Sequence, residues 1–175
     1  MIVGPALASY LVGSLPIARL AAPAREAGVS PRWLRAGMIA ADALKGLLVM
    51  GFLGASGNPY VQSLVATAVV AGQQWPFWTS ERDERGLAVA AGALTLVTPI
   101  AAPVWAVLWA IGYVASGYLT AGSAFATLLF PLATGFLAGW PFALVSLPVC
   151  VMVLERHRVA VRRMLAGLEP RHYWR

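Results

Sequence analysis

Long apolar runs broken by glycine and proline fill most of this chain, and they restrict it to folds with little water-facing surface. Of its 175 residues, 59% are hydrophobic and only 11% are charged, whereas a soluble domain carries about 25% charged residues. The runs do not alternate with polar residues, as half-buried strands would. Helices that satisfy their own backbone groups inside a bilayer have this composition. The sequence therefore predicts an all-α integral membrane protein, with residues 1–175 forming a single transmembrane domain.

The positive charge lies in three clusters that flank the apolar runs. They are Arg19 to Arg35, Arg82 with Arg85, and the tail from Arg156 to Arg175. A net charge of +6 in a soluble protein would suggest binding to nucleic acid, but arginines beside apolar runs fit the positive-inside rule better. We therefore expect no nucleic-acid partner, an external N-terminus and a cytoplasmic C-terminus. If all three clusters are cytoplasmic, an even number of helices separates each pair.

Breaks rich in glycine and proline divide the apolar runs into seven short helices. The first precedes Arg19, and a turn at 56–59 separates helices at 37–55 and 60–76. Breaks at 98–103, 116–117 and 139–141 leave four more, each of about 14–18 residues, whereas a full span needs about 20. The alternative is five spans with re-entrant segments, which also leaves an even number of spans between each pair of basic clusters. Glycines within these helices, such as Gly92 and Gly122, are candidates for close helix contacts.

Two polar features need an explanation in so apolar a chain. Asp42 and Lys45 lie three residues apart inside a predicted helix, so their side chains share a face and can form an ion pair. Charges at that depth usually face the bundle interior, although a lysine that extends to the interface would look the same. Arg82 and Arg85 have guanidinium groups suited to phosphate, but acidic residues 81, 83 and 84 also fit a solvated turn.

Further chemical signals are few. His157 in the tail is a possible proton carrier or a bystander at a helix end. Cys150 is the only cysteine, and the sequence has no metal-ligand spacing, phosphate-binding glycine loop or serine-nucleophile motif. We therefore expect neither a metal nor another cofactor.

Four segments together resemble one known family, the bacterial acyl-phosphate-dependent glycerol-3-phosphate acyltransferases. Residues 11–20 are similar to the YLLGSIPF start of the family, and residues 42–46 match its DxxKG motif. Residues 72–86 align without a gap with GHxFPxFxxFKGGKG, and residues 156–170 match the tail RHRxNIxRLLxGxEP. The four segments occur in the family's order and spacing and cover most of the chain.

The resemblance implies a seven-helix fold in the bacterial inner membrane, with the active site at the cytoplasmic surface. It implies transfer of a fatty acyl group from acyl phosphate to glycerol 3-phosphate, which gives lysophosphatidate for phospholipid biosynthesis. The implied partners are membrane lipids and these two small substrates. By position, the implied catalytic residues are His157 and Gln73, and the implied substrate-binding residues are Ser30, Arg35, Lys45, Arg82, Arg85 and Gly86.

Several positions depart from the family pattern. Most of the family's Gly-Ser-Gly-Asn loop after the first helix is missing, and residues 28–35 stand in its place. Gln73 replaces a histidine, Asp83 and Glu84 replace two glycines, and Ala160 replaces an asparagine. A glutamine forms hydrogen bonds but takes no proton at neutral pH. The resulting alternative is an inactive member that binds lipid or phosphate as a regulator, and a small transporter is a weaker third hypothesis.

Overall fold

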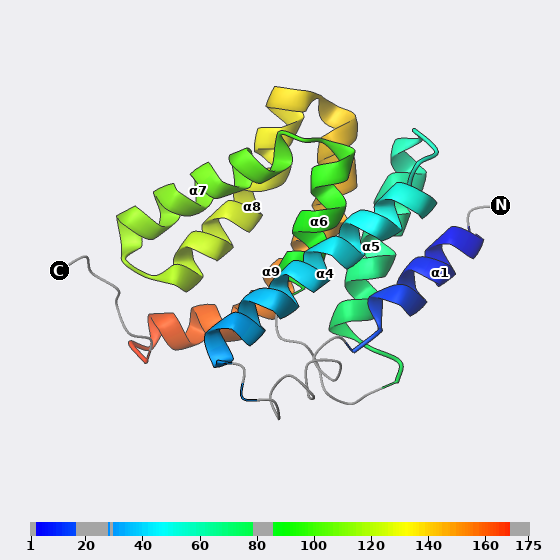
Figure 1. Ribbon diagram of the computed structural model, residues 1–175. Helices are drawn as coiled ribbons and strands as arrows, with labels where there is room; N and C mark the ends of the chain where they lie inside the picture. Colours follow the sequence, from blue (N-terminus) through cyan, green and yellow to red (C-terminus); the bar gives the residue numbers. More distant parts are fainter. Residues whose placement is uncertain (1–2, 17–27, 29, 79–85, 169–175) are drawn as a thin grey trace.

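Seven helices make up the part of the chain that this computed structural model describes, residues 3–16, 28, 30–78 and 86–168 (Figure 1). Their bounds are α1 Val3–Gly13, α4 Pro31–Leu53, α5 Pro59–Gln74, α6 Leu87–Val97, α7 Ala101–Ser116, α8 Leu119–Ala138 and α9 Trp140–Leu165. No strand occurs in these ranges. The predicted all-α class and the four predicted breaks are confirmed.

Local chemistry explains where the helices begin and end. Asn58 accepts a hydrogen bond from the backbone N–H of Tyr60 at 2.9 Å, and Pro59 occupies the first turn of α5. Gly117 ends α7 with a φ of 74°, a left-handed conformation that glycine adopts without strain. These are the turn and break residues that the sequence supplied.

Helix lengths differ from the predicted 14–18 residues for each of the last four helices. Pro131 and Pro148 are accommodated within α8 and α9. The last four helices have 11, 16, 20 and 26 residues, and α9 is the longest because it continues through Arg156 into the basic tail. By length and composition, α4 and α8 are long and apolar enough to cross a bilayer, while α1, α6 and α7 are shorter apolar helices. The 11 residues of α6 reach about 16 Å, roughly half of the hydrocarbon thickness.

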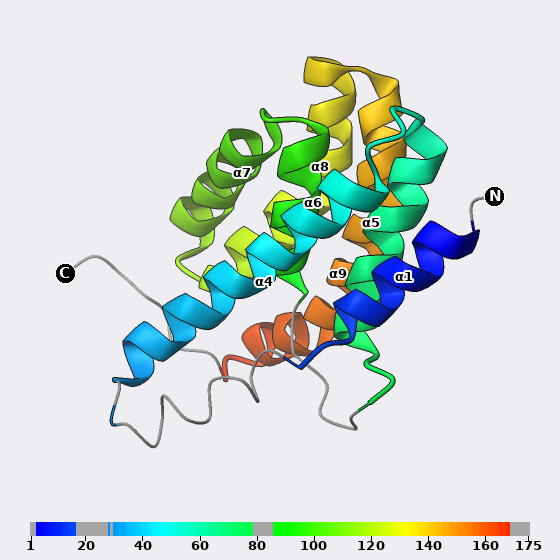
Figure 2. The same ribbon diagram turned by 45° about the vertical axis from the view of Figure 1, so that its right-hand side comes forward.

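Successive helices run in alternating directions (Figures 1 and 2). The α4–α5, α6–α7 and α8–α9 connections lie at the upper end in Figure 1. The C-terminal ends of α1, α5 and α9 lie at the lower end, as do the N-terminal ends of α4 and α6. This arrangement places the N-terminal end of α4 and the C-terminal end of α9, which carry basic residues, on the same side of the molecule. The predicted even number of helices between the first and the last basic cluster is therefore reproduced.

Most residues of the apolar interior are small, and most of the large apolar residues lie on the outer surface. Val65, Val69 and Val89 are fully buried, whereas Phe52 and Phe136 have exposed fractions of 82% and 80%. A water-soluble protein would bury its phenylalanines, because their burial stabilises the fold. In lipid there is no such driving force, and small residues that permit close helix contact collect at the interfaces instead.

Glycines bring two pairs of helices into backbone contact. A Cβ atom at Gly13 or Gly72 would collide with the backbone of the facing helix, so α1 and α5 touch there. A Cβ at Gly46 would collide with the Val89 carbonyl, and one at Gly92 with the Ala43 carbonyl, so α4 and α6 touch in the same way. The expectation that Gly92 permits close packing is confirmed. These contacts determine how deep Lys45, next to Gly46, lies in the bundle.

The substitution Gly46→Ala is expected to destabilise the fold, because its new methyl group would push α4 away from α6. Overpacking of this kind costs about 1–3 kcal/mol. Gly37→Ala in the same helix is the matched control, since nothing lies within 4 Å of a Cβ at that position. Thermal unfolding in detergent, followed by circular dichroism, should show a lower Tm for the first variant only. Equal Tm values would contradict the tight α4–α6 contact.

The alternating helix directions also predict a labelling pattern in sealed vesicles. Ala55 lies in the exposed α4–α5 turn and Ala166 is exposed beyond α9, with α5 to α9 between them. An odd number of crossings places the two positions on opposite sides of the membrane. In a Cys150→Ala background, Ala55→Cys and Ala166→Cys should react with an impermeant maleimide from opposite faces. Reaction from the same face would disprove the arrangement.

Candidate active site

The ammonium group of Lys45 lies where α1, α4 and α5 meet. Its Nζ donates to the Gly13 carbonyl at 3.0 Å, to the Leu15 carbonyl at 3.4 Å and to Gln73 Oε1. Asp42, one turn earlier on α4, forms an ion pair with it at 3.3 Å. Lys45 retains only 8% exposure. The predicted Asp42–Lys45 pair is therefore confirmed, and it faces the bundle interior.

The C-terminal end of α1 is also tied to the segment after α5. The Tyr10 hydroxyl donates to the Trp75 carbonyl at 2.8 Å. Trp78 Nε1 donates to the Ser14 hydroxyl oxygen at 2.8 Å, and Ser14 is buried. Tryptophans are common at the ends of membrane helices, where they lie at the membrane–water interface. The structure adds that their polar atoms hold α1 in place.

Arg156 joins α9 to the C-terminal end of α5. Its guanidinium donates to the Gln74 carbonyl and lies over the Trp75 ring, 5.4 Å from the centroid. A cation at the end of a helix interacts favourably with the partial negative charge of the last carbonyls, and a cation over tryptophan adds further attraction. Arg156 therefore stabilises the α5–α9 contact beside His157.

The amide of Gln74 lies against the first turn of α6. Gln74 is fully buried, and neither amide atom has a hydrogen-bond partner in the described part of the chain. A Cβ at Gly86 would lie 3.2 Å from Gln74 Nε2, and the φ of Gly86 is 55°. Glycine adopts this left-handed conformation without strain, and a side chain here would press against Gln74. Gly86 therefore allows the chain to enter α6 directly beside Gln74.

His157 is buried on α9, with 6% exposure. Its Nδ1 lies 2.9 Å from the Val153 carbonyl oxygen. Because a carbonyl only accepts, Nδ1 must carry the proton and donate it. In the neutral ring, Nε2 then carries the lone pair. This is the protonation pattern that a proton acceptor requires.

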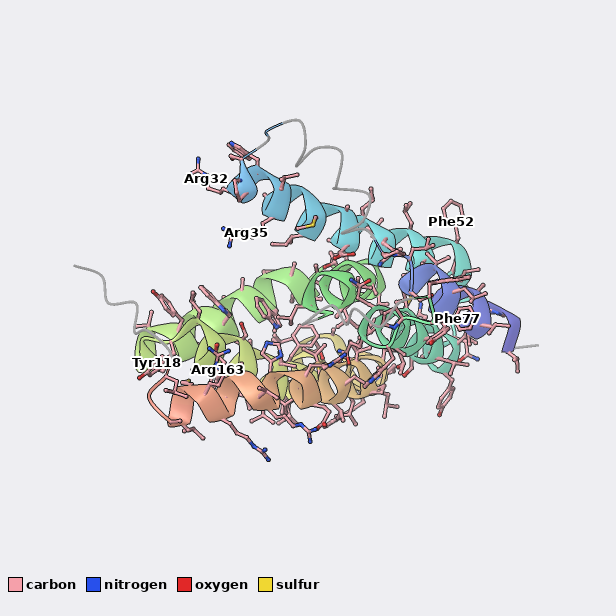
Figure 3. The ribbon with its side chains drawn as sticks, turned by 90° about the horizontal axis from the view of Figure 1, so that it is seen from below. Arg32, Arg35, Phe52, Phe77, Tyr118 and Arg163 are labelled. Carbon is pink, nitrogen blue, oxygen red and sulfur yellow. The ribbon has the colours of Figure 1, made fainter. Side chains whose placement is uncertain are left out.

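The other predicted site residues are placed differently. Ser30 and Arg35 are exposed at the N-terminal end of α4, and Arg35 Nε donates to the Pro31 carbonyl of its own helix at 3.3 Å. Arg35 precedes Lys45 by about 15 Å along the helix, so the two cations are not adjacent. Figure 3 shows Arg32 and Arg35 at the same end of the view as Arg163 on α9. Arg82 and Arg85 lie outside the described residues.

The structure therefore brings together Lys45 with Gln73, and places His157 directly after Arg156 in α9. Sequence reasoning missed the carbonyls of Gly13 and Leu15, the buried Gln74 amide and the structural use of Arg156. Backbone acceptors carry no residue-type signal, so no motif could reveal them. The position of Arg156 at the end of an apolar run was visible, but its partner on α5 was not.

Comparison with known proteins gives consistent matches. The sequence model of the glycerol-3-phosphate acyltransferase family matches residues 29–167. Glycerol-3-phosphate acyltransferase 2 of Moorella thermoacetica is 32% identical over 134 residues, which cover 75% of this chain and 69% of the relative. Glycerol-3-phosphate acyltransferase of Burkholderia ambifaria is 31% identical over 187 residues, covering 95% and 88%.

A solved structure has the same fold. The crystal structure of PlsY (YgiH), an integral membrane glycerol 3-phosphate acyltransferase in its glycerol 3-phosphate form, superposes with a TM-score of 0.81 at 20% identity. The superposition covers 98% of this chain and 96% of that one. The lysophosphatidic acid form gives the same TM-score at 21% identity.

The substitution Arg156→Met is expected to destabilise the protein, because the Gln74 carbonyl would lose its charged donor. Loss of a hydrogen bond to a charged group costs about 1.5–3 kcal/mol. Arg158→Met is the matched control: Arg158 is 61% exposed and pairs with Glu155 on the surface, and surface pairs contribute about 0–1 kcal/mol. Thermal unfolding in detergent should separate the two variants. A larger loss for Arg158→Met would contradict the assignment.

Proposed function

Because the chain belongs to the glycerol-3-phosphate acyltransferase family, we propose that it transfers a fatty acyl group from acyl phosphate to glycerol 3-phosphate. The product is lysophosphatidate, an intermediate of phospholipid biosynthesis. The observation that carries this proposal is the match of the family model over residues 29–167, which include every residue that the sequence implied as catalytic or substrate-binding.

The chain is a multi-pass membrane protein with the fold of an integral membrane enzyme. The relatives that match it come from bacteria, including Moorella thermoacetica and Burkholderia ambifaria. We place the protein in the bacterial inner membrane, with the lower end of Figure 1 facing the cytoplasm. This orientation follows from the arginines at the α4 and α9 ends, since basic flanks remain on the cytoplasmic side.

In the proposed reaction, a hydroxyl group of glycerol 3-phosphate attacks the carbonyl carbon of acyl phosphate. The new ester bond forms as the bond from the acyl carbon to the phosphate oxygen breaks, and inorganic phosphate leaves. Both substrates are anionic, so cationic side chains that hold them close together would lower the barrier by positioning and charge neutralisation. No metal or other cofactor enters this scheme.

The candidate residues other than Lys45 and Gln73 have the following proposed roles in this scheme. Arg35, Arg82 and Arg85 supply guanidinium groups suited to phosphate oxygens. Ser30 contributes a hydroxyl at the start of α4, and Gly86 gives a ligand access to the N–H groups that begin α6. His157 Nε2 accepts the proton of the attacking hydroxyl. A phosphate oxygen of a substrate is the second candidate acceptor for that proton.

The proposed role of the arginines predicts a specific loss of activity. In vesicles containing the purified protein, Arg35→Ala, Arg82→Ala and Arg85→Ala should each lower kcat/KM roughly 10- to 100-fold, because a charged hydrogen bond contributes about 1.5–3 kcal/mol. The measurement is lysophosphatidate formation that depends on acyl phosphate. Arg158→Ala is the control, because Arg158 is exposed and pairs with Glu155. Unchanged rates in the three variants would refute the site, and an inactive wild-type protein would refute the activity.

A further inference from the structure

The exposed surface of α9 changes from apolar to charged along the helix. Its exposed large side chains are apolar as far as Val151, and its first charged residue is Glu155. A helix that passes from lipid into the headgroup region has such a change at the boundary. The 26 residues of α9 reach about 39 Å, more than the hydrocarbon thickness of about 30 Å. The last turns of α9, from Glu155 to Leu165, therefore lie at the membrane surface.

These last turns have two different faces. They run across the lower end of the molecule in Figures 1 and 2. One face packs against the protein, since His157 is buried and Val161 and Met164 are half-buried. The other face is exposed and carries Arg158 and Arg162, which lie one turn apart. A basic face on a helix that lies at the membrane surface is typical of segments that bind anionic lipid.

Two of the four arginines in these turns are already engaged by the protein. Arg156 is bound to α5, and Arg158 forms an ion pair with Glu155 at 2.9 Å. Arg162 and Arg163 are exposed, and neither forms an ion pair or a side-chain hydrogen bond with another residue that the structure describes. Their guanidinium groups are therefore available to a ligand outside the protein.

We propose that Arg162 and Arg163 bind the phosphate groups of anionic phospholipids, in the leaflet at the lower end of Figure 1. A guanidinium group can donate two parallel hydrogen bonds to phosphate oxygens. The phosphates of lipid headgroups lie just outside the hydrocarbon region, at the depth where the surface of α9 becomes charged. This inference goes beyond the proposed acyltransferase activity and does not depend on it, because neither arginine is assigned to the active site.

Exposed leucines beside the arginines favour a lipid over a soluble anion. Leu165 lies three residues after Arg162 on α9, and Leu168 follows the end of the helix. Their exposed fractions are 77% and 69%. At the boundary between headgroups and acyl chains, both leucines can enter the apolar layer while the arginines remain beside the phosphates. A soluble phosphate would bind the arginines but leave both leucines in water.

Lipid retention in native mass spectrometry tests the proposal. The full-length protein in detergent is mixed with equal amounts of phosphatidylglycerol and phosphatidylcholine that carry the same acyl chains. The wild-type protein should retain mainly phosphatidylglycerol. In the double variant with Arg162→Gln and Arg163→Gln, the ratio of bound phosphatidylglycerol to bound phosphatidylcholine should fall roughly 10- to 30-fold, because each arginine near an anionic surface contributes about fivefold in affinity.

The neighbouring ion pair provides a matched control. Glu155→Gln combined with Arg158→Gln removes two exposed charged side chains and leaves the net charge unchanged, so the lipid ratio should stay close to that of the wild-type protein. Excess inorganic phosphate should not displace phosphatidylglycerol, because its acyl chains also hold it. Displacement by phosphate would overturn the proposal in favour of a soluble anion. An equal lipid ratio in the wild-type protein and the double arginine variant would overturn it as well, and would leave Arg162 and Arg163 only an interaction with the negative end of the α9 dipole.

Thermal unfolding in detergent gives a second measure and shows that the variants fold. Without added lipid, the Tm of the double arginine variant should stay close to that of the wild-type protein, because both side chains are exposed. Phosphatidylglycerol should raise the Tm of the wild-type protein more than phosphatidylcholine does, since a ligand that binds the folded state stabilises it. This difference should disappear in the variant, and its persistence would refute the proposal. Neither measurement requires turnover, so both are decided independently of lysophosphatidate formation.

Discussion

The ammonium group of Lys45 joins three helices in the buried interior, where the residue is only 8% exposed. Helix α1 ends after 11 residues, and its last carbonyls would have no hydrogen-bond donor in an apolar interior. Lys45 supplies that donor to Gly13 and Leu15, and Asp42 and Gln73 complete its surroundings. A buried charge and buried carbonyls are each costly alone. Together they satisfy one another, so the position of α1 depends on the lysine and the lysine depends on α1.

Arg156 provides a charged hydrogen-bond donor to the C-terminal end of α5, as Lys45 does for α1. It donates to the carbonyl of Gln74, at the C-terminal end of that helix, and stacks over Trp75. Helix C-terminal ends carry partial negative charge, which would oppose anionic substrates nearby. Both cations therefore neutralise the face on which the proposed reaction takes place. The remaining arginines at that face, such as Arg35, are then available to bind phosphate.

Close helix contacts make these polar interactions possible. Backbone contact at Gly46 and Gly92 holds α4 against α6, and contact at Gly13 and Gly72 holds α1 against α5. Valine and alanine predominate among the buried apolar residues, although Met50 and Phe130 are also buried, and many larger side chains such as Phe52 face outward. Lipid provides no hydrophobic force between helices, so shape and hydrogen bonding must determine their arrangement. The polar contacts at Lys45 and Arg156 therefore contribute specificity that apolar packing in lipid does not supply.

The amino-acid sequence alone determined the all-α class and the helix breaks at glycine and proline. It also determined the even number of helices between basic clusters and the Asp42–Lys45 pair. These features depend only on composition and local spacing. It also carried the family resemblance, through four ordered motifs. The tertiary structure alone decided what Lys45 and Arg156 bind, because their partners are backbone carbonyls of other helices, which no residue type encodes. Helix lengths were decided there as well, since α6 has only 11 residues and α9 continues through Arg156 to Leu165. The orientation of Gln73 likewise follows only from a lysine 28 positions away in the chain, brought within reach by glycine contacts.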